Sequence, residues 1–297
     1  MPTLKEIKGR IASVRGTLKI TSAMKLVSSA KLRKAQKATE AMRPYEAKLQ
    51  EMLAAVGGKA AAEGVAPEGA SAFFLATEGA TLPSDAVNAP AAIIAIASNS
   101  SLCGGFNANA VAKVRSVRQS GDVVYSIGRK MADAMRRDGF PSPEDFSALS
   151  ENPAYAPAAA LVEKLQQDLA EGRISRVLLV YNHFVSTARQ TPVVEDLLAS
   201  AGPTANANLT HADAEAIFEP SRAELLAALE PKLLKLKLYA ALLDSAAAEH
   251  AARTVAMQTA TDNGEKLLQE LTLQYNKGRQ QKITSEILDL AGGQAAQ

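Results

Sequence analysis

The sequence has little of what many catalytic and secreted proteins depend on. Its 297 residues include one cysteine, Cys103, no tryptophan and only 4% aromatic residues. A single cysteine excludes an intrachain disulfide and is compatible with a reducing compartment. The apolar stretch 225–243 is interrupted by charged residues and by Pro231, so we expect no membrane span there. Because the first ten residues lack an apolar signal region, we expect the protein to stay in the compartment where it is made.

Acidic residues are nearly absent from the N-terminal segment. Residues 1–37 contain ten lysines and arginines but only one acidic residue, Glu6, although the formal net charge of the whole chain is only +2. A basic helix of this kind is often a solvated face. It can also meet an anionic partner such as nucleic acid, lipid headgroups or acidic protein loops.

Prolines are absent from most of both chain ends, since twelve of the thirteen lie between Pro44 and Pro231. The N-terminal end carries an a/d heptad pattern, which predicts a coiled-coil helix. Its first positions are Leu4, Ile7, Ile11, Val14 and Leu18. We expect this helix to stop at Gly57-Gly58 and the C-terminal helix to run from about Pro231 to Gly292-Gly293.

Both helices have a weak middle, in which heptad positions carry small or polar residues. These positions are Thr21, Lys25 and Ser28 in the first helix and Ala247, His250, Thr254, Thr261 and Gly264 in the second. Helices of roughly 80 and 90 Å exceed the diameter of about 50 Å expected for a compact globule of this length, so they must bury their seams on each other or on a partner.

Aligning the two weak zones predicts an antiparallel pair in which facing residue numbers add up to about 280. On this register, residues beyond about Lys282 have no partner within the chain. This end nevertheless carries Ile283, Ile287, Leu288 and Leu290. An isolated apolar helix end predicts that another protein surrounds it.

The middle of the chain alternates strands and helices, which predicts a small α/β domain. We expect strands at 91–98, 122–128 and 176–186, and an antiparallel edge strand at 189–198 where Pro192 is tolerated. Helices are expected at 108–118, 129–137 and 156–170, and loops at 57–72 and 200–211. The predicted domains are residues 1–57, 73–219 and 221–297.

Three segments could carry chemistry of their own. The loop 98–109 joins a strand to a helix through two glycines, but its spacing fits no phosphate-binding motif, so we favour a turn or contact loop. Cys103 could be a nucleophile, although no motif places a histidine beside it and a buried apolar role is more usual. A metal site is the alternative to a solvated polar run at His211, Asp213 and Glu215.

Four segments resemble the gamma subunit of F-type ATP synthases. They are KITSAMKLVSSAKLRKAQ, MRPYE, LCGGFN and EHAARTVAMQTATDNGEKLLQELTLQYNKGRQQKITSEI. The last matches the family's C-terminal signature along its whole length. The resemblance implies an antiparallel coiled coil of the two terminal helices plus a Rossmann-like α/β domain, within the α/β class already predicted.

The resemblance also implies a function, that of a rotor shaft without catalysis or cofactors of its own. The family's shaft turns inside a hexamer of alpha and beta subunits and meets the epsilon subunit and the membrane ring of c subunits. The residues that would contact beta subunits are Met24, Lys25, Arg33, Arg253, Arg279, Gln280 and Thr284. The loop residues Leu102, Cys103 and Gly104 would contact a partner from the α/β domain.

The sequence departs from the family at the same loop. Asn99, Ser100 and Ser101 stand where the family usually has an aspartate, a basic residue and a glycine, which places a charged contact of this loop in question. The lack of a targeting segment implies a bacterial protein, peripheral on the cytoplasmic side of the inner membrane. Two alternatives are a basic coiled-coil adaptor that binds nucleic acid and a Rossmann-type enzyme with a helical appendage.

Overall fold

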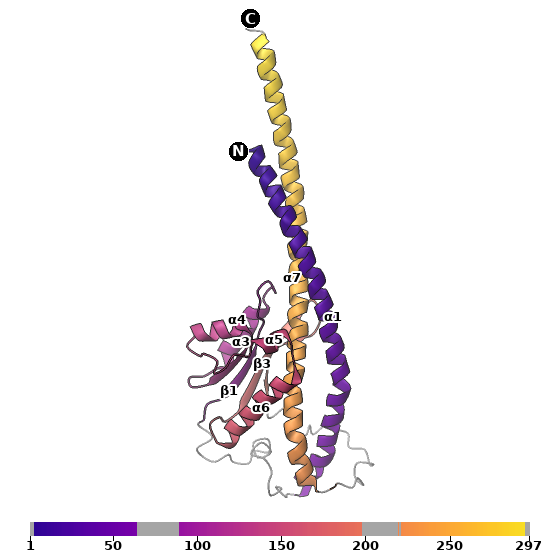
Figure 1. Cartoon of the computed structure of the whole chain (residues 1–297), viewed down its shortest axis with the longest axis vertical. Helices are drawn as coiled ribbons and strands as arrows, with labels where there is room; N and C mark the ends of the chain where they lie inside the picture. Colours follow the sequence, from indigo (N-terminus) through magenta and orange to yellow (C-terminus); the bar gives the residue numbers. More distant parts are fainter. Residues whose placement is uncertain (1–2, 64–88, 198–218, 220, 295–297) are drawn as a thin grey trace. The chain divides into compact units, whose positions relative to one another are not determined.

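The computed structural model describes residues 3–63, 89–197, 219 and 221–294, and it forms two compact units (Figure 1). One unit combines residues 1–30 with 253–297, and the other comprises residues 31–252. The first consists of the ends of two long helices, α1 (Leu4–Glu63) and α7 (Arg222–Gln294). The second holds a sheet domain together with the remaining parts of these helices. The domain boundaries inferred from the sequence stay a prediction.

Helix α1 begins with a capping box. The Thr3 backbone N–H donates to Glu6 Oε2 over 2.9 Å, and the Glu6 N–H donates to Thr3 Oγ1 over 3.3 Å. This exchange satisfies two backbone donors that a helix start leaves without partners. The predicted stop at Gly57-Gly58 is wrong, because α1 continues to Glu63. Each helical glycine costs about 1 kcal/mol relative to alanine, which the alanine-rich segment around it can offset.

Helix α7 also starts elsewhere than predicted. It begins at Arg222, so Pro231 lies inside the helix and is not its first residue. The Ser221 hydroxyl accepts a hydrogen bond from the Glu224 N–H over 3.2 Å, which caps the helix start. The sequence signal for this start was the pair Ser221 and Glu224, spaced as a capping box requires.

The sheet has four strands in the order β2-β1-β3-β4. Strands β1 (Ala92–Ile96), β2 (Val123–Ile127) and β3 (Val177–Phe184) are parallel, and β4 (Gln190–Asp196) pairs antiparallel with β3. All four predicted strands are therefore confirmed. Every residue of β1 is buried, as expected for an apolar strand covered on both faces.

Two helices cover one face of this sheet. Met131 and Met135 of α4 (Arg129–Arg137) and Ala110 and Val114 of α3 (Phe106–Val117) are fully buried there. They pack with strand side chains such as Ile93 in one apolar cluster. Both helices were predicted within two residues of their observed bounds.

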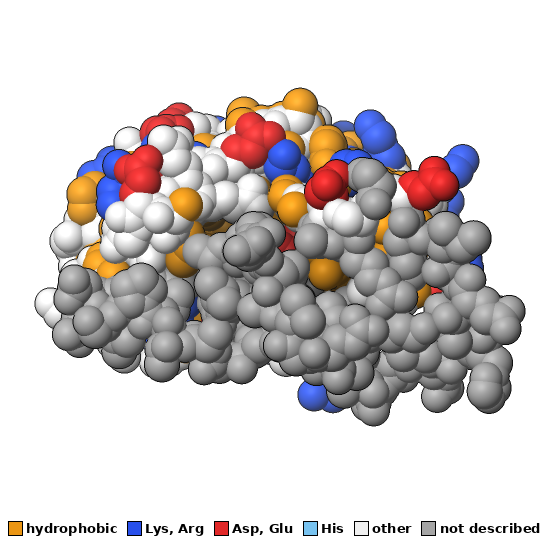
Figure 2. Space-filling model, turned by 90° about the horizontal axis from the view of Figure 1, so that it is seen from below, with side chains coloured by type: hydrophobic (Ala, Val, Ile, Leu, Met, Phe, Trp, Pro, Cys, Tyr) orange, Lys and Arg blue, Asp and Glu red, His pale blue; other side chains and the backbone are white. Residues whose placement is uncertain are grey.

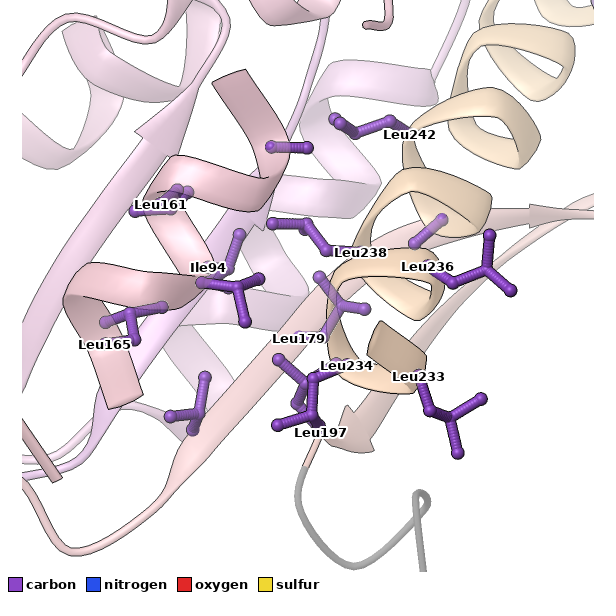
Figure 3. Packing of buried hydrophobic residues seen from close by; sticks show 14 of the residues in the cluster. Ile94, Leu161, Leu165, Leu179, Leu197, Leu233, Leu234, Leu236, Leu238 and Leu242 are labelled. Atoms are coloured by element: carbon purple, nitrogen blue, oxygen red, sulfur yellow. The ribbon is translucent and has the colours of Figure 1, made fainter. Parts of the chain in front are cut away.

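The opposite face is covered by α6 (Tyr155–Ala170), the short helix α5 (Ser147–Glu151) and parts of α1 and α7. Leu161 and Leu165 of α6 belong to one apolar cluster with Ile94 of β1 and leucines of α7, part of which Figure 3 shows. Leu234 and Leu238 of α7 are at most 1% exposed. Helix α5 was missed, since five residues are too few to show a helical period. Helices on both faces of a mostly parallel sheet confirm the predicted α/β class.

Candidate functional site

The paired helix ends form the candidate functional site, and their register agrees with the one predicted. The Thr21 and Thr261 side-chain oxygens lie 2.9 Å apart. Lys25 Nζ donates to Gln258 Oε1 over 2.8 Å. The residue numbers of these facing pairs add up to 282 and 283, within one helical turn of the predicted 280. The pairing is antiparallel, because increasing numbers in α1 meet decreasing numbers in α7.

The seam of this pair is polar where two-stranded coils usually carry leucine or isoleucine. Thr21, Ser28 and Thr261 are buried, each at most 8% exposed. The Thr21 hydroxyl lies 3.2 Å from the Leu18 carbonyl oxygen, and that of Thr261 lies 2.8 Å from the Met257 carbonyl oxygen. Since both hydroxyls have backbone acceptors, their burial costs little. Little apolar area is gained there either.

Two glycines of α7 allow the helices to approach closely. A Cβ placed on Gly264 would lie 2.7 Å from Leu18 Cδ2, and one on Gly278 would lie 3.1 Å from Leu4 Cδ2. Both distances are shorter than ordinary van der Waals contact. Small residues such as Gly264, predicted from the sequence to weaken the seam, therefore allow a short distance between the two helix axes.

Large apolar side chains lie on the outside of the same unit. Ile20, Leu26 and Val27 of α1 are 57–68% exposed, although the next residues, Thr21 and Ser28, are buried. At the far end of α7, residues 281–288 are all exposed. Ile287 and Leu288 are 59% and 65% exposed. A cluster of exposed apolar side chains on paired helices indicates a protein-binding surface.

The side chains predicted to contact partners are spread along both helices rather than gathered in one pocket. Met24 and Lys25 are half-buried, whereas Arg33 is exposed on α1. Arg279, Gln280 and Thr284 are exposed on α7, and the Thr284 hydroxyl donates to the Gln280 carbonyl over 2.9 Å.

Arg253 differs from the other predicted contact residues. Its side chain is only 7% exposed within this chain, so most of its surface is already covered by the chain itself. The spacing of the sequence predicts that Arg253 lies on a helix. It did not predict that its side chain is buried.

The loop between β1 and α3 is held by its own polar side chains. Asn107 Oδ1 accepts from the Ser98 N–H over 3.0 Å. Asn99 Nδ2 donates to the Ser147 carbonyl over 2.8 Å, while Asn99 Oδ1 accepts from the Arg129 N–H over 2.9 Å. Asn99, which departs from the family pattern, thus ties the loop to the starts of α4 and α5.

The three loop residues predicted as a contact point have different surroundings. Leu102 is 58% exposed and adopts φ of 65°, a left-handed conformation that is uncommon outside glycine. Gly104 is exposed and has φ of 59°. Cys103 is 1% exposed and packs with Phe106 and with alanines of α7, so it is not accessible as a nucleophile in this structure.

A polar cluster that the sequence did not indicate fastens β3 to α7. Asp244 accepts hydrogen bonds from the Phe184 N–H over 3.3 Å, and its Oδ2 lies 2.6 Å from His183 Nδ1. Burial raises the pKa of Asp244, and the hydrogen bond to His183 opposes this rise. Nearby, burial raises the pKa of Tyr181, whose hydroxyl donates to Glu195 over 2.8 Å, and burial lowers the pKa of Lys237.

The described ranges contain neither a candidate metal site nor a helix that could span a membrane. No group of three or more His, Cys, Asp and Glu side chains there could hold a metal ion. His211, Asp213 and Glu215 lie outside the described residues, as do the loop predicted at 200–211 and residues 64–72 of the other. No helix in the described ranges has the length and apolar content that crossing a bilayer requires. Acidic, basic and apolar side chains are interspersed on the described part of the face in Figure 2.

These features define a class of protein. Two long terminal helices pair in antiparallel orientation through a thin, polar seam, and the same helices carry exposed apolar and basic side chains. The segment between them in sequence forms a small α/β domain with a mixed sheet. This arrangement is that of an interaction protein whose helical pair is completed by partners.

Comparison with known proteins identifies the family. The model of the ATP synthase family matches residues 3–296. The chain is 43% identical to the ATP synthase gamma chain of Phocaeicola vulgatus, with all of both chains covered. It is 36% identical to that of Pelotomaculum thermopropionicum, covering 100% of this chain and 99% of the relative. The chain therefore belongs to the ATP synthase gamma chain family, which confirms the resemblance.

Solved structures support the fold. A chain of the mitochondrial ATP synthase of Euglena gracilis, from the structure of its OSCP, F1 and c-ring, matches with a TM-score of 0.67 at 18% identity, covering 99% of this chain and 94% of that one. A chain from the central stalk and c-ring of the Tetrahymena thermophila enzyme matches with a TM-score of 0.55 at 22% identity, covering 81% and 99%. These likenesses confirm the predicted combination of paired terminal helices and a small α/β domain.

Proposed function

We propose that this chain is the central-stalk rotor subunit of an F-type ATP synthase. In this role it transmits rotation between a ring of c subunits in the membrane and a catalytic hexamer of alpha and beta subunits. The chain itself performs no catalysis and holds no cofactor. Membership of the gamma chain family over the full length of the sequence supports the proposal.

The end of α7 is the observation that carries the proposal. On the observed register, Leu4, the first residue of α1, faces Gly278, so the last turns of α7 extend beyond the start of α1. Residues 281–288 are exposed and include Ile283, which is 47% exposed. Such an apolar helix end requires a surrounding protein, and a ring of subunits would supply one.

The polar seam suits a part that must turn against similar partners. Large interlocking side chains would create a deep energy minimum wherever the rotor surface met each partner. Small and polar side chains, such as Thr21 and Thr261, keep the pair thin and its contacts shallow. By this account Met24, Lys25, Arg33, Arg279, Gln280 and Thr284 contact beta subunits. For the buried Arg253, a contact requires its side chain to turn outward.

Further partners and the location belong to the same proposal. The loop at Leu102, Cys103 and Gly104, on the α/β domain, would meet the epsilon subunit or a beta subunit. Cys103 is buried, so a partner would reach Leu102 and Gly104 first. The protein would be peripheral on the cytoplasmic side of the inner membrane, attached through the c-ring.

Reconstitution tests the proposed function. The tagged full-length chain should co-purify with alpha, beta and c subunits from membranes. A gamma-depleted complex should regain coupled ATP synthesis only when the chain is added. Binding to DNA that weakens steeply with salt, together with failure to co-purify, would favour the nucleic-acid adaptor. Saturable nucleotide turnover by the chain alone would favour the enzyme.

The basic face of α1 provides a narrower test. Reversing Lys25, Lys31 and Arg33 to Glu should weaken assembly at low salt, because acidic loops of the partner would then be repelled. Reversal of two exposed basic residues of α4, Arg136 and Arg137, is the matched control and should leave assembly unchanged. Normal assembly of the first variant would refute the charge-pairing part of the proposal.

A further inference from the structure

A cleft between α5 and α6 includes no residue of the helical pair and has no role in the proposed rotor function. It has a volume of about 550 Å³ and is formed entirely by residues 144–164. This volume lies within the range of about 300–1,000 Å³ typical of protein binding pockets. We call it the α5–α6 cleft.

The floor of the α5–α6 cleft is apolar and fixed in place. Leu149 and Leu161 line it while being only 2–3% exposed, since both belong to the main core of the α/β domain. Phe146 also lines it and packs against the same core, with its ring centroid 6.2 Å from that of Tyr125. A partner would therefore meet a preformed surface and would not have to order it.

The walls of the α5–α6 cleft are small and open to solvent. Ala148 of α5 and Ala154, Pro157 and Ala160 at or near α6 line the cleft and are all exposed. Small side chains allow the backbone of a bound segment to approach closely. Unlike the core leucines, these residues can be changed with little effect on the fold.

The rim of the α5–α6 cleft is acidic. Glu144, Asp145 and Glu151 line it, and the only basic lining residue is Lys164, which forms an ion pair with Glu144. A hydrogen bond from the Ser147 backbone N–H lowers the pKa of Asp145, so this carboxylate is charged at neutral pH. Glu151 has no ion pair with any described residue. The positive charge of Arg129 also lowers the pKa of Asp145, so Glu151 is the rim carboxylate best placed for a basic partner, with Asp145 beside it.

We propose that the α5–α6 cleft binds a basic amphipathic segment of a partner protein, which places an apolar side chain on the floor and lysine or arginine side chains on the rim. Apolar anchors flanked by basic residues are the usual means by which a short helix occupies an acidic groove. The negative rim excludes nucleic acid and anionic lipid, since both would bring phosphates against carboxylates.

A displayed library of random peptides, selected on the immobilised full-length chain, tests this proposal. Selected peptides are then measured by fluorescence anisotropy against three variants, each checked for native circular dichroism. Glu151→Lys should weaken binding by roughly five- to tenfold, as replacing attraction by repulsion at a partly exposed pair would. Ala160→Tyr should fill the cleft and weaken binding by at least about tenfold. Asp133→Lys, which reverses an exposed acid on α4, should have no effect.

The amino-acid composition of the selected peptides tests which kind of partner the α5–α6 cleft binds. We expect the cleft-dependent peptides to combine a large apolar residue with flanking lysine or arginine. Failure to recover any peptide that is weakened by both Glu151→Lys and Ala160→Tyr would overturn the proposal. So would cleft-dependent peptides that are acidic, or self-association of the chain that Ala160→Tyr abolishes. Because the test uses the isolated chain, its result is independent of whether the chain restores ATP synthesis.

Discussion

Helix α7 is packed in two different ways along its length. In the unit formed by residues 31–252 it contributes large buried leucines, and Leu233, Leu234 and Leu238 are each at most 1% exposed. In the other unit its buried seam includes Met257, Thr261 and Leu271, with glycines facing leucines of α1. One continuous helix thus belongs both to a conventional core and to a thin pair whose seam mixes apolar residues with buried threonines.

The difference shows where stability comes from the chain and where it must come from partners. Each fully buried leucine stabilises a fold by roughly 1.5–3 kcal/mol, so the sheet domain can be stable alone. A threonine pair or a glycine contact buries little apolar area. We therefore interpret the helical pair as the part of the molecule that assembly completes.

The largest expected effect is in the core of the sheet domain. Leu238→Ala should lower the free energy of unfolding by about 2–5 kcal/mol, because it leaves a cavity at a fully buried site. Urea denaturation followed by circular dichroism measures this loss. The control Leu273→Ala, at a side chain 74% exposed, should change the free energy by less than about 0.5 kcal/mol. Equal losses would contradict the comparison.

A smaller effect is expected at the closest approach in the helical pair. Gly264→Leu should destabilise the pair by about 1–3 kcal/mol, because the new side chain would collide with Leu18. Hydrogen exchange of amides in residues 4–30 reports the loss. A second change, Leu18→Ala, should restore part of the stability.

The matched control for this test is another helical glycine. Gly16→Ala meets no atom within 4 Å and should stabilise α1 by about 0.5–1 kcal/mol through helix propensity alone. If Gly264→Leu also slowed exchange, the close packing at this position would be disproved.

The polar seam should show a weak coupling. A double-mutant cycle with Thr21→Val and Thr261→Val should give an interaction energy of about 0.5–1.5 kcal/mol, the usual net value of one hydrogen bond. The double variant should be close to the wild type, because replacing both hydroxyls with methyl groups of similar shape leaves no buried polar group without a partner. An interaction energy several times larger would mean that the threonines are a main source of stability.

The smallest effect concerns an ion pair on the surface of the sheet domain. Arg115 donates two hydrogen bonds to Asp138, over 2.7 and 2.8 Å, and these lower the pKa of that carboxyl below its ordinary value. The contribution of this ion pair to stability is therefore present above about pH 4. It is lost as the pH falls through the lowered pKa of Asp138. Asp138→Asn should be less stable than the wild type at pH 7, with the difference shrinking below pH 4. If the stability difference between Asp138→Asn and the wild type grew below pH 4, the predicted direction of the pH dependence would be wrong.

The long-range pairing could be predicted because the sequence repeats its signal many times. Heptad spacing and two matching weak zones fixed the register to within about two residues, and the alternation of apolar runs with turns located all four strands. The ends of the helices were harder. The capping pair Ser221 and Glu224 marks the start of α7. Pro231, which is acceptable as a first helical residue, led to a predicted start nine residues too late.

The surroundings of single side chains could not be predicted. Nothing in the spacing distinguishes the buried Arg253 from the exposed Arg279, because burial depends on what packs over the helix. The tie between Asp244 and His183 joins residues far apart in the sequence, so no local pattern contains it. The α5–α6 cleft arises from a five-residue helix that is too short to recognise.

Hydrogen exchange of the full chain, alone and in the assembled complex, tests the central claim most directly. We predict that amides of residues 255–288 exchange much faster than those of residues 233–245 in the isolated chain and become strongly protected when alpha and beta subunits are added. If the two segments of α7 are equally protected without partners, the helical pair is stable by itself and the account is wrong.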